Sequence, residues 1–308
     1  MKVLLKIVGA VMLLSVIMWA LIMMLLENWI GFGISVAMIG MLLIVFTYEF
    51  FHRKPLKLEI SSLFKGVALM MSGVITFYLS AATNSILAAA LMGLIGAMLL
   101  LPYKAPIYVG AFIGMTVVLN IFMLLICLLI GAIIYILLED ELDGIGGKYG
   151  TIAFVSVFII VLFFNRETSP INIDLLTNLL LIGVAIASSL ATFFLNKYVD
   201  NTVLSSAFIG LLFGAVLLFS SEPIIKDVCL IGFAATFIGM QTRFKYYLLF
   251  ISAILLVILY NFYYLYAGIG GSLGFLAFLS LMPLVCVDDI IKRKNPFLSQ
   301  PLSQQKEV

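Results

Sequence analysis

The sequence predicts an all-α integral membrane protein, a polytopic helical bundle of 10–12 spans with two pseudo-symmetric repeats. Three observations lead to this prediction. First, 64% of the 308 residues are hydrophobic, only 10% are charged, and the mean hydropathy is +1.26, more apolar surface than a water-soluble chain of this size can bury. Second, the apolar residues fall into many segments near the ~20-residue length of a spanning helix. Third, a glycine-rich segment occurs twice.

The two glycine-rich segments begin the sequences "GIGGKYGTIAFVS" (144–156) and "GIGGSLGFLAFLS" (268–280), which share eight of thirteen residues at a distance of 124. Two further matches occur in the same order: residues 83–101 resemble 200–219, and "FIGM" occurs at 112–115 and 237–240. These matches predict repeat 1 over residues 60–165 and repeat 2 over 174–287. Tandem units of this size are common in secondary transporters.

A two-helix preamble, residues 1–59, precedes the repeats. Its first apolar segment, 3–26, is too long for a secretory signal and has no small-x-small cleavage site, so we expect it to remain as the first membrane helix. The second, 30–51, ends at the basic "HRKPLK", which we expect on the cytoplasmic side. Residues 288–308 are expected to form a cytoplasmic polar tail.

Each repeat contains five apolar segments, of which the third is short. In repeat 1 they cover residues 60–81, 85–101, 107–117, 120–138 and 149–164. In repeat 2 they cover residues 174–195, 202–220, 228–240, 246–266 and 273–287. The polar "NRETSPINID" connects the two units.

The short third segments leave two topologies open. If each dips into the bilayer and returns, the chain has 10 spans and parallel repeats; if each crosses, it has 12 spans and the second repeat is inverted. Each arrangement places 15 of the 17 Lys and Arg residues inside, so the positive-inside rule does not choose between them. Both predict a multi-pass protein of the cell (cytoplasmic) membrane with its N-terminus and C-terminus in the cytoplasm.

The glycine segments have two interpretations. Glycines three residues apart on a helix, such as Gly144, Gly147 and Gly150, make a smooth surface for a neighbouring helix. Alternatively, each segment is a helix break that presents backbone groups to a solute. The second interpretation predicts these substrate-binding residues: Gly144, Gly146, Gly147, Gly268, Gly270 and Gly271, with hydroxyl support from Ser156 and Ser280.

The sequence does not fix the charge of such a solute. "EDELD" precedes the first segment, whereas the aligned stretch before the second is "YYLYA", so a symmetric carboxylate cage is excluded. Backbone N–H groups at a helix start favour anions, while carbonyl groups favour desolvated cations.

Other function classes find little support. The single histidine, His52, lies in a basic loop, and the chain shows no metal-ligand cluster, no catalytic constellation and no phosphate-binding loop. We therefore expect no enzyme activity, no catalytic residues, no metal and no cofactor. The net charge of +2 implies no nucleic-acid partner.

The expected function is membrane transport of a small solute or ion, by a secondary transporter or channel, through a site formed by the paired glycine-rich breaks. The expected partners are the lipid bilayer and the solute, and a homo-oligomer remains open. The alternative is a non-transporting membrane scaffold or assembly factor whose glycines serve helix packing.

Overall fold

The computed structural model describes residues 2–27, 33, 35–41, 59–117, 120–162, 174–220, 222–243 and 245–294, and this part contains helices and no strand. Its helices are α1 (Lys2–Glu27), α3 (Ile60–Ala82), α4 (Ser85–Leu99), α5 (Lys104–Gly114), α6 (Ile121–Leu138), α7 (Lys148–Val161), α8 (Leu175–Val199), α9 (Thr202–Phe219), α10 (Pro223–Gly239), α11 (Leu249–Tyr260) and α12 (Ser272–Lys294). Of the predicted span 30–51, residues 33 and 35–41 are described and helical. The rest of that span, the connector and the end of the tail lie outside the described residues.

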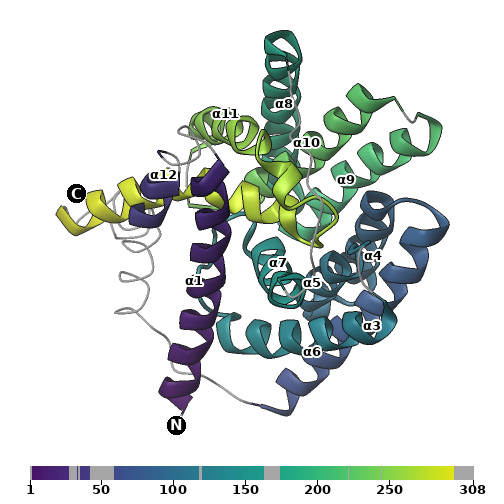
Figure 1. Cartoon of the computed structure of the whole chain (residues 1–308). Helices are drawn as coiled ribbons and strands as arrows, with labels where there is room; N and C mark the ends of the chain where they lie inside the picture. Colours follow the sequence, from purple (N-terminus) through teal and green to yellow (C-terminus); the bar gives the residue numbers. More distant parts are fainter. Residues whose placement is uncertain are drawn as a thin grey trace.

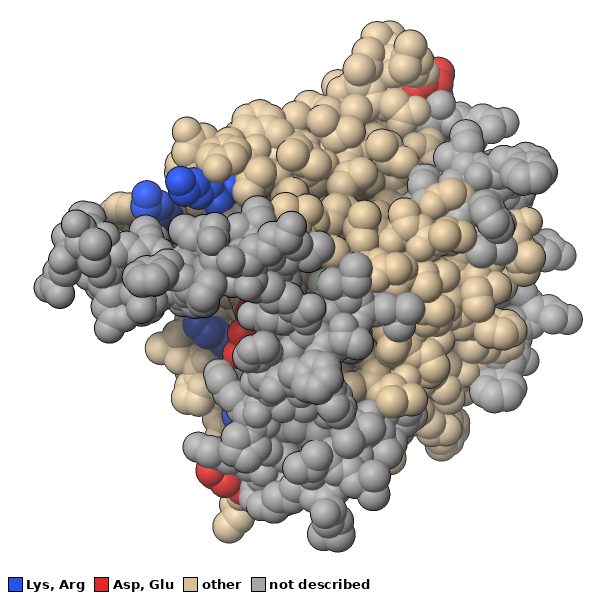
Figure 2. Space-filling view, turned by 90° about the vertical axis from the view of Figure 1, so that its left-hand side faces the viewer, with Lys and Arg blue, Asp and Glu red and all other residues tan. Residues whose placement is uncertain are grey.

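Four helices of the described part, α3, α6, α8 and α9, are long and apolar enough to cross a membrane. On α3, large apolar side chains recur every three to four residues on the exposed face: Leu63, Val67, Met71, Ile75 and Tyr78. In the view of Figure 2, charged side chains form only a few small spots on the coloured surface. An exterior of this kind suits lipid rather than water, in agreement with the predicted multi-pass membrane class.

The helix bounds depart from the predicted ones in the second repeat. Helix α10 begins at Pro223, five residues before the predicted start, because proline has the backbone angle of a first helical turn and needs no N–H partner there. Helix α12 continues to Lys294 through "DDIIKRK", which was predicted to follow it. The predicted segment 246–266 divides into α11 and two 3₁₀ turns.

The helices form two groups that pack alike (Figure 1). In the first group α3 packs on α5 and α6, and α7 packs on α5 and α6; in the second, α8 packs on α10 and α11, and α12 packs on α10 and α11. The groups meet where α4 lies beside α9 and where α7 crosses α12, while α1 lies against α6 and α7. Helix α5 is buried from Pro106 to Gly114, so the core lies around α5, α7, α10 and α12.

Helices α4 and α9 run antiparallel, and a reciprocal pair of asparagines joins them. Asn84 caps α4 by accepting a hydrogen bond from Leu87 N–H, and its amide donates to Gly214 O near the end of α9 at 2.9 Å. Asn201 caps α9 in the same manner, and its amide donates to Ala97 O near the end of α4 at 3.3 Å. The start of each helix therefore lies beside the end of the other.

Candidate functional site

The two glycine segments, residues 144–147 and 268–271, adopt the same backbone conformation immediately before α7 and α12. In each, the first and fourth glycines have left-handed angles, with φ of 77° and 79° at Gly144 and Gly147 and of 78° and 81° at Gly268 and Gly271. Residues other than glycine rarely adopt these backbone angles. The chain therefore turns sharply into each helix.

Each glycine segment lies against the FIGM segment (112–115 or 237–240) of the other helix group and is hydrogen-bonded to the residues that directly follow it. Thr242 N–H donates to Gly144 O at 3.0 Å, and Val117 N–H donates to Gly268 O at 3.2 Å. A Cβ on Gly146 would lie 2.0 Å from Phe237 O, and one on Gly270 would lie 2.2 Å from Phe112 O. The middle of each segment thus lies directly against the backbone of the opposite group.

The fourth glycines lie where α7 and α12 cross. A Cβ on Gly147 would lie 2.4 Å from Gly274 O, and one on Gly271 would lie 2.3 Å from Gly150 O. Distances this short admit no side chain. Close helix packing is therefore a part of what these glycines do, because residues without side chains let two backbones approach.

A cluster of aromatic side chains fills the centre between α5 and α10. The ring centroids of Phe112 and Phe237 lie 5.2 Å apart. The ring of Phe112 also lies 6.4 Å from that of Phe233, and the ring of Phe237 lies 6.3 Å from that of Tyr108. The Tyr108 hydroxyl hydrogen-bonds the Ser206 hydroxyl at 3.0 Å, which in turn hydrogen-bonds Thr236 at 2.8 Å. Three rings of this cluster, those of Phe112, Phe233 and Phe237, also line the cavity described next.

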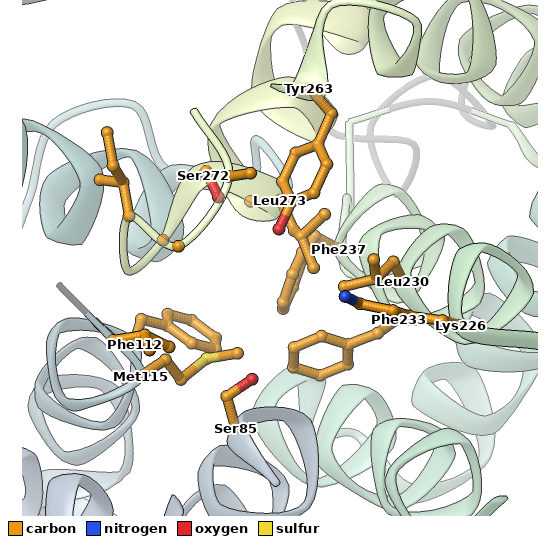
Figure 3. Close-up of a pocket in the computed structure, with 16 residues that line it drawn as sticks. Ser85, Phe112, Met115, Lys226, Leu230, Phe233, Phe237, Tyr263, Ser272 and Leu273 are labelled. Atoms are coloured by element: carbon orange, nitrogen blue, oxygen red, sulfur yellow. The ribbon is translucent and has the colours of Figure 1, made fainter. Parts of the chain in front are cut away.

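A cavity of about 370 Å³ lies beside the second glycine segment (Figure 3). Its wall contains the aromatic side chains Phe112, Phe233 and Phe237, and the start of α12 closes another side. At its rim Val117 is 76% exposed and Lys226 is also exposed, so the cavity communicates with the surface. The full set of lining residues falls in α4, α5, α10, α12, and the loops after α5 and before α12.

Several polar groups face this cavity. In Figure 3 the Lys226 ammonium, the Tyr263 hydroxyl and the Ser85 hydroxyl are directed into the same space from three elements. Ser272, the first residue of α12, also lines it and is only 3% exposed. In the described part of the chain, no protein group hydrogen-bonds the side chains of Lys226, Ser85 or Ser272.

At the first glycine segment, Lys148 occupies the position that Ser272 has in the second. Lys148 is 6% exposed, forms an ion pair with Asp143 at 3.1 Å and donates to Glu139 O. The void beside Lys148, to which Leu13 of α1 contributes, measures only about 10 Å³, the minimum for one water molecule. Among the described residues, Lys148 and its partners therefore fill this side.

Two more contacts hold that side together. Lys65 at the start of α3 forms an ion pair with Glu139 at the end of α6. Arg243, in the loop after α10, donates from Nε to Asp143 O at 2.8 Å. The acidic "EDELD" stretch thus binds three cations of the protein.

The structure separates the predicted site residues. Gly268 and Gly271 line the cavity, whereas Gly144, Gly146, Gly147 and Gly270 are not among its lining residues. Ser156 and Ser280 are fully buried and donate to carbonyls of their own helices, Ile152 O and Ala277 O.

Sequence reasoning missed Ser85, Lys226 and the aromatic wall. A signal was present for Lys226: it is the single cation between Lys197 and Arg243, and the aligned residue of repeat 1 is Leu101. No group of three or more His, Cys, Asp or Glu side chains that could hold a metal ion occurs among the described residues. Comparisons with protein families, with curated proteins and with solved structures find no match to the chain.

Proposed function

We propose that the chain is a membrane transporter or facilitator for a small solute or ion, built from two inverted repeats, residues 60–165 and 174–287. The observation that carries the proposal is a duplicated set of contacts around one accessible cavity. Each glycine segment lies against the opposite FIGM segment and is hydrogen-bonded to the residues directly after it. Among the described residues, the second segment borders a cavity of about 370 Å³, whereas Lys148 after the first borders a void of about 10 Å³.

The contacts recur at the spacing of the sequence repeat. Ser72 Oγ donates to Ile107 O at 2.8 Å between α3 and α5, and Ser188 Oγ donates to Gly232 O at 2.6 Å between α8 and α10. The same correspondence between equivalent residues of the two repeats holds for the asparagine pair of α4 and α9, for the aromatic pairs and for the glycine contacts. Two unrelated sets of helices would not be expected to have so many equivalent contacts, so a common fold of the two repeats is the simplest explanation.

The directions of the paired helices favour the inverted arrangement. Equivalent helices α4 and α9 are antiparallel, and so are α7 and α12, since Gly147 lies by Phe278 and Gly271 lies by Phe154. A two-fold axis that relates such helices is perpendicular to them. If these helices cross the bilayer, the axis lies in the membrane plane, as in transporters with inverted repeats. Five spans per repeat and two in the preamble then make 12.

This arrangement places the glycine segments near the bilayer midplane and on opposite sides of it. With the N-terminus in the cytoplasm, the turn between α3 and α4, the start of α10 and the start of α12 face outward, together with the cavity. Lys148 and the "EDELD" contacts face the cytoplasm and close the path there. The conformation described is therefore open to the outside, and transport follows when the repeats exchange arrangements.

The test is uptake into vesicles that contain the purified chain, with a broad panel of labelled solutes. Ala267→Phe places an aromatic ring in the cavity and is expected to abolish the flux found for the wild type. Val216→Phe on the exposed face of α9 is the control and is expected to transport normally. Undiminished flux through a well-folded Ala267→Phe variant would place the path elsewhere.

The alternative, a scaffold or assembly factor, draws support from the close packing of the glycines. It predicts no flux for any solute in the panel and a partner protein that co-purifies in a fixed ratio. Both results together would replace the transport proposal.

A further inference from the structure

We infer that the solute held in the cavity is a small organic anion with an apolar body, of the class of aromatic or aliphatic carboxylates. The inference rests on the proposed function, because it names the chemical class that the same site takes. It is carried by the charge, the hydrogen-bond donors and the wall of the cavity.

The charge of the cavity is positive. Lys226 is the single charged side chain among its described lining residues. Its neighbour in the chain, Asp227, accepts a hydrogen bond from the Tyr260 hydroxyl at 2.8 Å and is not among the residues that line the cavity. A cationic solute would find repulsion here and no carboxylate to offset it.

The start of α12 adds hydrogen-bond donors. The first N–H groups of a helix have no partner within the helix, and in the described part of the chain no protein group accepts from Leu273 N–H or Gly274 N–H. Both residues line the cavity, next to the Ser272 hydroxyl, which is also unpartnered and belongs to a residue only 3% exposed. Donors without acceptors, at the positive end of a helix dipole and beside an ammonium group, suit an anionic head group.

The opposite wall is apolar. Phe112, Phe233 and Phe237 are each at most 2% exposed and present their rings to the cavity, with Met115 and Leu230 beside them. A hydrated inorganic ion would leave this wall without a partner. A ring or short chain attached to the anionic group would cover it, and about 370 Å³ lies at the lower end of the range for small-molecule sites.

Binding is measured with the full chain in nanodiscs of phosphatidylcholine, by calorimetry, with benzoate and its neutral isostere benzamide as probes. Benzoate is expected to bind and benzamide to bind at least roughly tenfold more weakly, since a hydrogen-bonded charge contributes about that factor or more. Lys226→Gln is expected to remove the preference for benzoate, and Lys226→Arg to retain it. Lys245→Gln changes an exposed lysine of the loop after α10 and is expected to leave the preference intact.

Each contrary result overturns the inference. Equal binding of the two probes, or an unchanged preference in Lys226→Gln, would show that no anion is recognised here. Absence of benzoate binding, with thermal stabilisation only after phosphatidylglycerol is added, would assign the cavity to a lipid head group.

The same measurements keep the inference apart from the transport proposal. Anion binding without flux in vesicles would support the anion inference and contradict the transport proposal. If a neutral or cationic solute is transported and Lys226→Gln does not reduce its flux, the transport proposal is supported and the anion inference is contradicted.

Discussion

Gly150 and Gly274 touch at the crossing of α7 and α12. A Cβ on Gly150 would lie 2.6 Å from the Cα of Gly274, and a Cβ on Gly274 would lie 2.7 Å from the Cα of Gly150. In the proposed arrangement the two-fold axis passes through this contact, so the two glycine segments, Lys148 and the cavity are all placed relative to it.

Gly150→Ala is expected to lower the stability of the folded chain by about 1–3 kcal/mol, because the added methyl group forces two helix backbones apart. Gly183→Ala is the matched control: it lies in α8 with nothing within 4 Å of its added Cβ, and alanine there favours the helix. Thermal unfolding in detergent measures both. An unchanged melting temperature in Gly150→Ala would mean that the crossing is looser than described.

The reciprocal asparagines supply a second prediction. Asn84→Ser keeps an acceptor for the cap of α4 but loses the amide that donates to Gly214 O, and Asn201→Ser does the same toward Ala97 O. We expect each change to cost about 0.5–1 kcal/mol, within the range for interhelical hydrogen bonds in membranes. Asn120→Ser is the control, since that exposed asparagine accepts from Met123 N–H as the cap of α6. Equal melting temperatures for all three variants would contradict the prediction.

The inverted topology predicts that the ends of α3 and α8 lie on opposite sides of the membrane. Ala81→Cys and Tyr198→Cys place thiols at equivalent exposed positions, and Tyr198 is 90% exposed. The native Cys127, Cys229 and Cys286 are buried and should react little. With a membrane-impermeant maleimide on intact cells, we expect labelling at position 81 and none at 198 until the cells are opened. Labelling of both positions from one side would establish parallel repeats instead.

Lys148 is expected to keep the cytoplasmic side closed, because it joins the start of α7 to Glu139 O and Asp143. Lys148→Met should therefore raise several-fold the rate at which a cysteine at Thr151, which lines the small void, reacts with a small thiol reagent. Lys245→Met should not change this rate. The reaction is followed by mass spectrometry on the purified Thr151→Cys chain, and equal rates in Lys148→Met and its parent would show that Lys148 is not a closure.

The glycine segments themselves are poor positions for testing transport. Any side chain at Gly147 or Gly271 meets backbone atoms of the opposite helix and requires a left-handed backbone, so loss of flux in such variants would not separate a lost site from a lost fold. Ala267 borders open space and avoids this ambiguity.

The sequence by itself determined the all-helical membrane class, the approximate bounds of most of the described helices, and the positions of the two glycine-rich segments. The bilayer requires each spanning helix, independently of the others, to be apolar and about 20 residues long. Composition and segment length can therefore be read from the local sequence. The capping role of Asn120 is local in the same way, because the hydrogen bond that it accepts comes from Met123, three residues away.

Only the tertiary structure decided which helices meet, in which direction, and where space remains. The positive-inside count was equal for two topologies, whereas the bonds of Asn84 and Asn201 each join residues more than a hundred positions apart and give the direction of α4 relative to α9. The glycine segments are alike in sequence and in backbone angles, yet the first is followed by the buried, ion-paired Lys148 and the second borders a cavity lined by Lys226. That difference depends on side chains brought from other helices, and a local pattern contains no information about them.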